Sequence, residues 1–122
     1  MNAIERRSVR GGPAVKNLLL AVCRAFQLRG VEVLLGRSRV HALVRARCYA
    51  ASVLRDKKFA FSTPEIGKIL GGRDHTSILY YLKKYVVLLR DDVHFRDSVQ
   101  TAESIRERLD KETNVTEAGG GI

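Results

Sequence analysis

The sequence predicts an all-α fold, a small helical bundle that contains a helix-turn-helix. Apolar residues recur at intervals of three and four in successive segments, which is the period of helices that pack on one face. A capping box, Ser62-Thr63-Pro64-Glu65, marks a helix start, and the pair Gly71-Gly72 separates that helix from the next apolar segment. The 122 residues, 45% of them hydrophobic, suffice for one core and one domain.

The two chain ends are expected to lie outside this domain. Residues 1–13 are basic and polar and end in Gly11-Gly12-Pro13, which predicts a flexible leader. Residues 113–122 contain three successive glycines and predict a disordered tail, which leaves residues 14–112 as the folded domain. The first helix would run from Ala14 to about residue 28, with an apolar face made of Val15, Leu18, Leu19, Val22, Cys23 and Phe26.

The second helix is expected after a basic turn. A short segment, Val31 to Leu35, leads into the turn Gly36-Arg37-Ser38-Arg39. The helix then runs from about Val40 to Arg55 and is followed by a loop from Lys57 to Phe61. Its inward residues would be Leu43, Ala50, Val53 and Leu54, and its outward residues Arg45 and Arg47.

The third and fourth helices are expected to form the helix-turn-helix. The third begins at the capping box and stops at Gly71-Gly72, and Asp74 is a suitable N-cap for the fourth. Asp91-Asp92 interrupts the apolar pattern, and a last helix packs across the bundle. The inward residues would be Ile66, Ile69 and Leu70 in the third helix, Ile78, Leu79, Leu82, Tyr85, Val86 and Leu89 in the fourth, and Phe95, Val99, Ala102, Ile105 and Leu109 in the last.

The formal net charge of +9 is unevenly distributed along the chain. Residues 1–55 contain 11 Lys and Arg against two acidic residues, whereas residues 56–122 contain 11 of each sign. Such one-sided positive charge suits a polyanion, because neutralised phosphates release their counterions. A nucleic acid is therefore the expected partner. A solvated basic face without a partner, or an anionic membrane surface, is the alternative.

Several classes of function are not expected. Cys23 and Cys48 have no further Cys or His at metal-ligand spacing, which predicts two buried, reduced thiols and no metal. His41, His75 and His94 do not combine with a nucleophile and an orienting group, so no catalysis is expected. No Gly-rich loop ends in Gly-Lys-Ser or Gly-Lys-Thr, so no nucleotide or other cofactor is expected. Without a signal peptide or a membrane-length apolar run, the chain is expected in the cytoplasm, at the nucleoid.

The start of the fourth helix carries the residues best suited to reading DNA. A helix N-terminus presents free N–H groups and short side chains outward, and its dipole favours phosphate. Asp74 can accept from cytosine N4, His75 can donate to guanine, and Thr76 offers a methyl and a hydroxyl. Ser77 adds a second hydroxyl. In the competing interpretation Asp74 only caps the helix, and the other side chains are solvated.

Residues 64–79, PEIGKILGGRDHTSIL, resemble the signature of the C-terminal DNA-binding domain of bacterial DnaA replication initiators. In that family the run GGRDHTTV opens the recognition helix, and this sequence shares the capping box, the glycine pair and the Arg-Asp-His-Thr order. The resemblance extends in weaker form over about residues 14–110. It implies a Trp-repressor-like helix-turn-helix that binds DNA.

The resemblance also implies roles for individual residues. Asp74-His75-Thr76 would contact bases in the major groove. Ser77 stands where the family usually has threonine, so it keeps the hydroxyl but lacks the methyl. Arg39 takes the place of an arginine that enters the adjacent minor groove, and Arg37 would be its phosphate-facing neighbour.

Further contacts to phosphate are implied along the second helix and after it. The family has an Arg-Gln pair that touches the DNA backbone, and Arg47-Cys48 stands there, so the arginine contact is kept and the glutamine contact is lost. The loop that follows departs from the family, so solvated side chains are the alternative to phosphate contacts for Arg55, Lys57 and Lys58. Pro64 is expected near the phosphates, where it holds the helix start.

The expected function is sequence-specific binding of double-stranded DNA at boxes of the TTATNCACA type, with a role in replication initiation or transcription. The chain would then compete with the host replication initiator for these boxes. The alternative is an interaction protein that keeps the fold but binds the initiator or another replication protein. In either case Arg73 is expected to pair with Asp74 and to orient the turn before the fourth helix.

Overall fold

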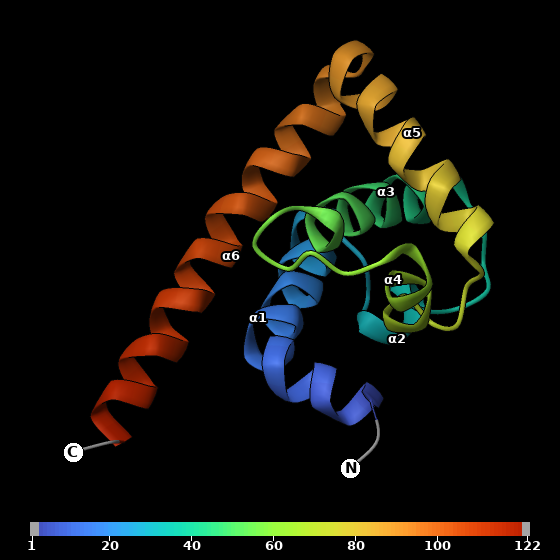
Figure 1. Ribbon diagram of the computed structural model, residues 1–122. Helices are drawn as coiled ribbons and strands as arrows, with labels where there is room; N and C mark the ends of the chain where they lie inside the picture. Colours follow the sequence, from blue (N-terminus) through green and yellow to red (C-terminus); the bar gives the residue numbers. More distant parts are fainter. Residues whose placement is uncertain (1–2, 121–122) are drawn as a thin grey trace.

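The computed structural model describes the backbone of residues 3–120 and the side chains of residues 12–113. Within these residues the protein consists of helices and contains no strand, which confirms the all-α prediction (Figure 1). The helices are α1 (Ala3–Ala25), α2 (Val31–Leu34), α3 (His41–Arg55), α4 (Thr63–Ile69), α5 (His75–Asp91) and α6 (Val93–Gly120).

Helix α3 is the centre of the bundle. It packs against α1, α4 and α5, and the side chains of Cys48, Tyr49 and Leu54 are fully buried in the core. The thiol of Cys23 is buried as well, so both cysteines are buried and reduced, as predicted. Burial is the largest cause of the raised pKa of the Cys48 thiol, about 12, so this thiol stays protonated at neutral pH.

Helix α6 turns back sharply from α5 and runs beside α1, so it packs across the bundle as predicted (Figure 1). Phe95, Val99 and Ala102 are its buried residues. Further along, the Asn17 side chain of α1 donates to Asp110 Oδ1 at 2.8 Å and to Thr113 Oγ1 at 3.2 Å. A buried amide paired in this way fixes how α6 lies along α1.

The two terminal helices extend beyond the predicted domain. Helix α1 begins at Ala3 and passes through Gly11-Gly12-Pro13, where a leader and a turn were expected, and α6 continues to Gly120, past the predicted end at residue 112. Proline inside a helix removes one N–H donor, and a helix can continue across it with the loss of that hydrogen bond. The outermost residues of the predicted leader and tail, 1–2 and 121–122, lie outside the described residues.

The buried face of α5 also differs from the prediction. Leu79 and Val86 were expected to point inward, but they are 45% and 62% exposed, whereas Tyr81 and Leu88 are buried. The reason is that apolar residues occupy almost every side of this helix, so the apolar period alone does not fix which side faces the core.

Candidate nucleic-acid interface

Helix α4 begins at the capping box that the sequence predicts. Ser62 Oγ accepts from the backbone N–H of Glu65 at 3.3 Å, and Glu65 Oε1 accepts from that of Ser62 at 2.8 Å. Pro64 lies in the first turn, where its missing N–H has no helical partner to lose, and its side chain is exposed. This exposure is compatible with the predicted place of Pro64 near phosphates.

The turn between α4 and α5 is tight because two glycines lie in it and a third, Gly67, lies in α4 where the turn packs against the helix. Gly71 and Gly72 have φ values of +92° and +84°, in the left-handed region that favours glycine. The backbone N–H groups of Gly72 and Arg73 both donate to Gly67 O at 2.9 Å. A Cβ at Gly67 would lie 2.0 Å from Arg73 O, so only glycine allows α4 to approach the turn this closely.

Helix α5 starts with an N-cap. Asp74 Oδ1 accepts from the backbone N–H of Ser77 at 3.0 Å, and this hydrogen bond is the main cause that lowers the pKa of the Asp74 carboxyl. His75 and Thr76 are exposed next to the cap, and Ser77 is half-buried. Asp74 therefore has the capping role of the competing interpretation. That role does not prevent its exposed carboxylate from accepting a further hydrogen bond.

The outer face of α5 continues beyond these residues. Leu79 and Tyr80 are 45% and 53% exposed, and Lys84 Nζ lies 5.8 Å from the centre of the Tyr80 ring. On an α-helix, residues three and four apart lie on one face, so Leu79 and Tyr80 extend the face that begins at His75 and Thr76. Neither residue was predicted to lie on this exposed face. The sequence feature that could have indicated it is the number of apolar residues on α5, which exceeds what one buried face can hold.

The basic turn lies between α2 and α3. Arg37, Ser38 and Arg39 are all exposed there. The guanidinium groups predicted to meet the minor groove and a phosphate are therefore accessible. Ser38 Oγ accepts from the backbone N–H of Val40 at 3.5 Å, at the entry to α3.

Arg47 does not lie at the surface, where it was predicted. Its side chain is fully buried instead of facing outward, so it is not in a position to touch a phosphate. Its Nε donates to Leu34 O at 2.8 Å, its Nη1 to Ser38 O at 2.6 Å and its Nη2 to Gly36 O at 2.9 Å. Arg47 thus holds the backbone of the basic turn from inside. Arg45, also predicted outward, is half-buried and pairs with Asp92.

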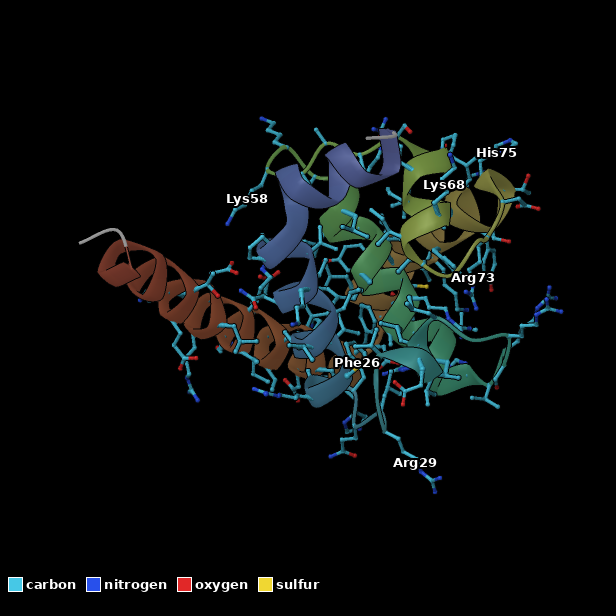
Figure 2. The ribbon with its side chains drawn as sticks, turned by 90° about the horizontal axis from the view of Figure 1, so that it is seen from below. Phe26, Arg29, Lys58, Lys68, Arg73 and His75 are labelled. Atoms are coloured by element: carbon cyan, nitrogen blue, oxygen red, sulfur yellow. The ribbon has the colours of Figure 1, made fainter. Side chains whose placement is uncertain are left out.

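Arg73 also differs from the expectation. Its hydrogen bonds do not go to Asp74: Nε donates to Tyr81 Oη at 3.1 Å, and Nη2 donates to Gly36 O. Nη1 donates to Leu70 O and, at 3.4 Å, to Leu35 O. Figure 2 shows Arg73 on the same side of the molecule as His75. The residue before the cap therefore connects the helix-turn-helix to the segment that ends α2.

The remaining predicted phosphate contacts lie at the far end of α3. Arg55, Lys57 and Lys58 are exposed, and Arg55 Nη1 donates to Phe61 O at 3.1 Å. Lys58 Nζ lies 3.8 Å from Asp110 Oδ2 of α6. Figure 2 shows Lys58 on the opposite side of the molecule from His75. The structure therefore brings Lys58 next to α6 and not next to the start of α5.

The described residues contain neither a membrane-spanning helix nor a cluster of metal ligands. None of their helices has the length and apolar character needed to cross a bilayer. The same residues contain no group of three or more His, Cys, Asp or Glu side chains that could hold a metal ion.

The chain is similar to known bacterial proteins. The family described as "Bacterial dnaA protein helix-turn-helix" matches residues 15–84, which include the basic turn, α4 and the first part of α5. The "Chromosomal replication initiator protein DnaA" of Thermomicrobium roseum is 36% identical over 105 residues, which are 86% of this chain and 22% of that protein. Its counterpart in Geobacter sulfurreducens is 39% identical over 80 residues, 66% of this chain and 18% of that protein. The chain therefore spans about a fifth of these relatives.

Proposed function

The chain belongs to the bacterial DnaA helix-turn-helix family, and we propose that it binds double-stranded DNA in a sequence-specific way, at boxes of the TTATNCACA type. Residues Asp74 to Ser77 at the start of α5 would read bases in the major groove. Arg39 would enter the adjacent minor groove, and Arg37 would contact a phosphate.

One observation carries this proposal: α5 presents a capped, exposed N-terminus directly after a tight glycine turn. Asp74 fixes the first turn of the helix by accepting from the Ser77 N–H at 3.0 Å, and His75 and Thr76 are exposed beside it. A helix held in this way can lay its first residues against base edges, while its N–H groups favour phosphate.

A second observation supports a composite site. Two exposed arginines, Arg37 and Arg39, lie in a turn whose backbone is hydrogen-bonded to Arg73, the residue before the α5 cap. The minor groove distinguishes little more than A·T from G·C pairs. Arg39 would therefore add a preference for an A·T-rich end to the base readout by α5.

Binding to a labelled duplex tests the proposal. The duplex carries one TTATNCACA box, and unlabelled box and scrambled duplexes of equal composition serve as competitors at a fixed salt concentration. Specific binding predicts that the box competitor displaces the label at a concentration at least about tenfold lower than the scrambled one. Equal competition by both would overturn sequence-specific binding.

A protein-binding function is the second candidate, and exposed apolar residues favour it. Val86 and Val87 on α5 are 62% and 45% exposed, and Val93 at the start of α6 is 54% exposed. An interaction protein that binds the initiator or another replication protein would use such a surface. Under this function the chain would bind the partner protein rather than the box duplex, and a Val86→Asp, Val87→Asp double variant would lose that partner.

The biological role that fits the proposed binding is occupation of initiator boxes. A chain that holds a box would compete there with the host replication initiator, and it would thereby modulate replication initiation or transcription from neighbouring promoters. Competition is measurable directly, because adding the chain to initiator bound at a single labelled box would release the initiator.

A further inference from the structure

The end of α2 is held by two arginines that come from other parts of the chain. The last carbonyl groups of a helix have no partner within the helix. Leu34 O accepts from Arg47 Nε at 2.8 Å, and Gly36 O accepts from both Arg47 Nη2 and Arg73 Nη2. Both guanidinium groups therefore converge on the short segment that carries Arg37 and Arg39.

Arg73 connects this segment to α5 through a hydrogen bond to a tyrosine. Tyr81 is buried on the inner face of α5, and its Oη accepts from Arg73 Nε at 3.1 Å. The same guanidinium donates to Leu70 O at the end of α4 and to Leu35 O and Gly36 O. One side chain thus joins the two helices of the helix-turn-helix to the basic turn.

The like charges of Arg47 and Arg73 lie close enough to affect each other. Burial is the main cause that lowers the pKa of Arg47, and the charge of Arg73 lowers it further. Both side chains bind carbonyl oxygens in the fork geometry that only a planar guanidinium provides, and lysine cannot reproduce this arrangement. The cluster is therefore specific to arginine.

A second contact joins the same two segments through the backbone, next to the Arg73 guanidinium. A Cβ at Gly71 would lie 2.1 Å from Leu35 O, so the glycine turn packs directly against the end of α2. A Cβ at Gly72 would meet nothing within 4 Å, although Gly72 has a similar φ, +84° against +92°. Both glycines therefore have a left-handed backbone conformation, but only Gly71 packs against Leu35.

We propose that Arg47, Arg73 and Tyr81 are positioning residues that fix the basic turn of Arg37 and Arg39 relative to the start of α5. The minor-groove arginine and the major-groove helix would then meet DNA as one rigid unit, with a fixed spacing between the two ends of the box. This inference rests on the proposed function, because it assigns both segments to the same DNA site.

Amide hydrogen exchange in the DNA-free protein tests the structural part. The N–H groups of Leu35 and Gly36 donate to Val31 O at 2.9 Å and to Val33 O at 3.2 Å, so their exchange reports opening of the segment. Arg73→Lys and Tyr81→Phe are expected to speed this exchange by roughly tenfold or more relative to amides at the centre of α3. Unchanged exchange in both variants would overturn the proposal.

Two matched controls accompany these variants. Tyr85→Phe removes a phenolic hydroxyl from the same helix, one turn further on, where that hydroxyl interacts with Ser52 and not with Arg73. It is expected to leave the exchange of Leu35 and Gly36 unchanged. Gly71→Ala is expected to speed this exchange and Gly72→Ala is not, although both variants carry the same backbone strain. Equal effects of the two alanines would argue against a contact between the turn and α2.

DNA binding by the same variants tests the functional part. In Arg73→Lys, preference at the A·T-rich end of the box is expected to fall at least about fivefold, while preference at the positions read by Thr76 is retained. The Arg39→Ala change is then expected to have little further effect in the Arg73→Lys background. A uniform loss at all positions would overturn the positioning role. Wild-type binding that ignores the box would instead refute the proposed function, and the exchange result would still decide whether the network holds the turn.

Discussion

Thr76 is exposed in the first turn of α5, and we propose that its methyl and hydroxyl read a base pair. Replacing Thr76 with alanine is expected to cost about 1–3 kcal/mol on the box and to relax the preference at one base pair. Fluorescence anisotropy with a set of singly substituted boxes measures both effects. Thr101→Ala on α6, where the hydroxyl donates to Asp97 O, is the control with the same chemical change. A box preference unchanged by Thr76→Ala would remove Thr76 from the interface.

Arg39 is exposed in the basic turn, and its proposed role is confined to one end of the box. Arg39→Ala is expected to weaken binding mainly to boxes with an A·T-rich end, because a narrow A·T minor groove attracts arginine. Arg29 is another exposed arginine, and Figure 2 places it away from His75, so Arg29→Ala serves as the control. The affinities of wild type and Arg39→Ala are measured for boxes with A·T pairs and for boxes with G·C pairs at that end. Loss of affinity that is independent of those pairs would reassign Arg39 to the phosphates.

Arg47, unlike Thr76 and Arg39, is expected to act on stability and not on DNA. Arg47→Met keeps an unbranched, although shorter, side chain but removes every donor, which leaves buried carbonyl oxygens unpaired at about 1–3 kcal/mol each. The free energy of unfolding, measured by urea titration followed by circular dichroism, is therefore expected to fall by more than about 2 kcal/mol. Arg108→Met, an exposed position on α6, is expected to change it little. Equal stabilities of the two variants would contradict the burial of Arg47.

The junction of α5 and α6 depends on Asp92, the residue between the two helices. It follows the last residue of α5, and its Oδ1 accepts from the backbone N–H of Phe95 at 3.0 Å as an N-cap of α6. Its other carboxylate oxygen pairs with Arg45 of α3, whose guanidinium carbon lies 5.4 Å from the centre of the Phe95 ring. One carboxylate thus joins three helices.

This junction predicts a dependence of stability on pH. The hydrogen bond from Arg45, followed by that from Phe95, lowers the pKa of Asp92 from 3.8 to about 2. The contribution of Asp92 is therefore fully present above the unfolded pKa, near 4, and is lost as the pH falls through about 2. Asp92→Asn is expected to flatten the fall in unfolding free energy over that interval, and Asp97→Asn, an exposed neighbour, is expected to leave it unchanged. Parallel pH profiles of wild type and Asp92→Asn would contradict the pairing.

At the scale of the elements, the sequence predicted the helix starts and turns that depend on hydrogen bonds between neighbouring residues. The capping box at Ser62, the glycine turn and the Asp74 cap were all predicted, because each depends on hydrogen bonds within a few residues. The rotation of α5 was not predicted, because apolar residues surround the helix and tertiary packing chooses among the sides. The start of α1 before Pro13 was missed because glycine and proline signal a turn in most contexts.

The candidate site was predictable only in part. The exposure of Arg37, Arg39, His75 and Thr76 agrees with the sequence-based assignments, whereas their contacts to DNA stay predictions. The burial of Arg47 was not predictable, because arginine is rarely fully buried and its partners here are backbone carbonyls of a distant turn. Every residue has a backbone carbonyl group, so the sequence does not show which of them will pair with an arginine.

For the whole molecule, fewer basic side chains are available to a partner than the count along the sequence suggests. Residues 1–55 supply the excess of basic residues, but Arg45 pairs with Asp92 and Arg47 is buried among carbonyl groups. These two arginines support the fold and do not face a phosphate. Arg37→Ala, at an exposed site, is therefore expected to make the salt dependence of DNA binding shallower by about one unit of slope. A slope unchanged by Arg37→Ala would show that no phosphate is contacted there.

The central claim, that this chain reads a specific duplex sequence through the start of α5, is tested most directly by selecting bound duplexes from a random pool. The wild-type chain is predicted to enrich an asymmetric box of the TTATNCACA type, and Thr76→Ala is predicted to lose the preference at one position within it. Recovery of sequences indistinguishable from the starting pool would contradict the claim and leave only charge-driven binding.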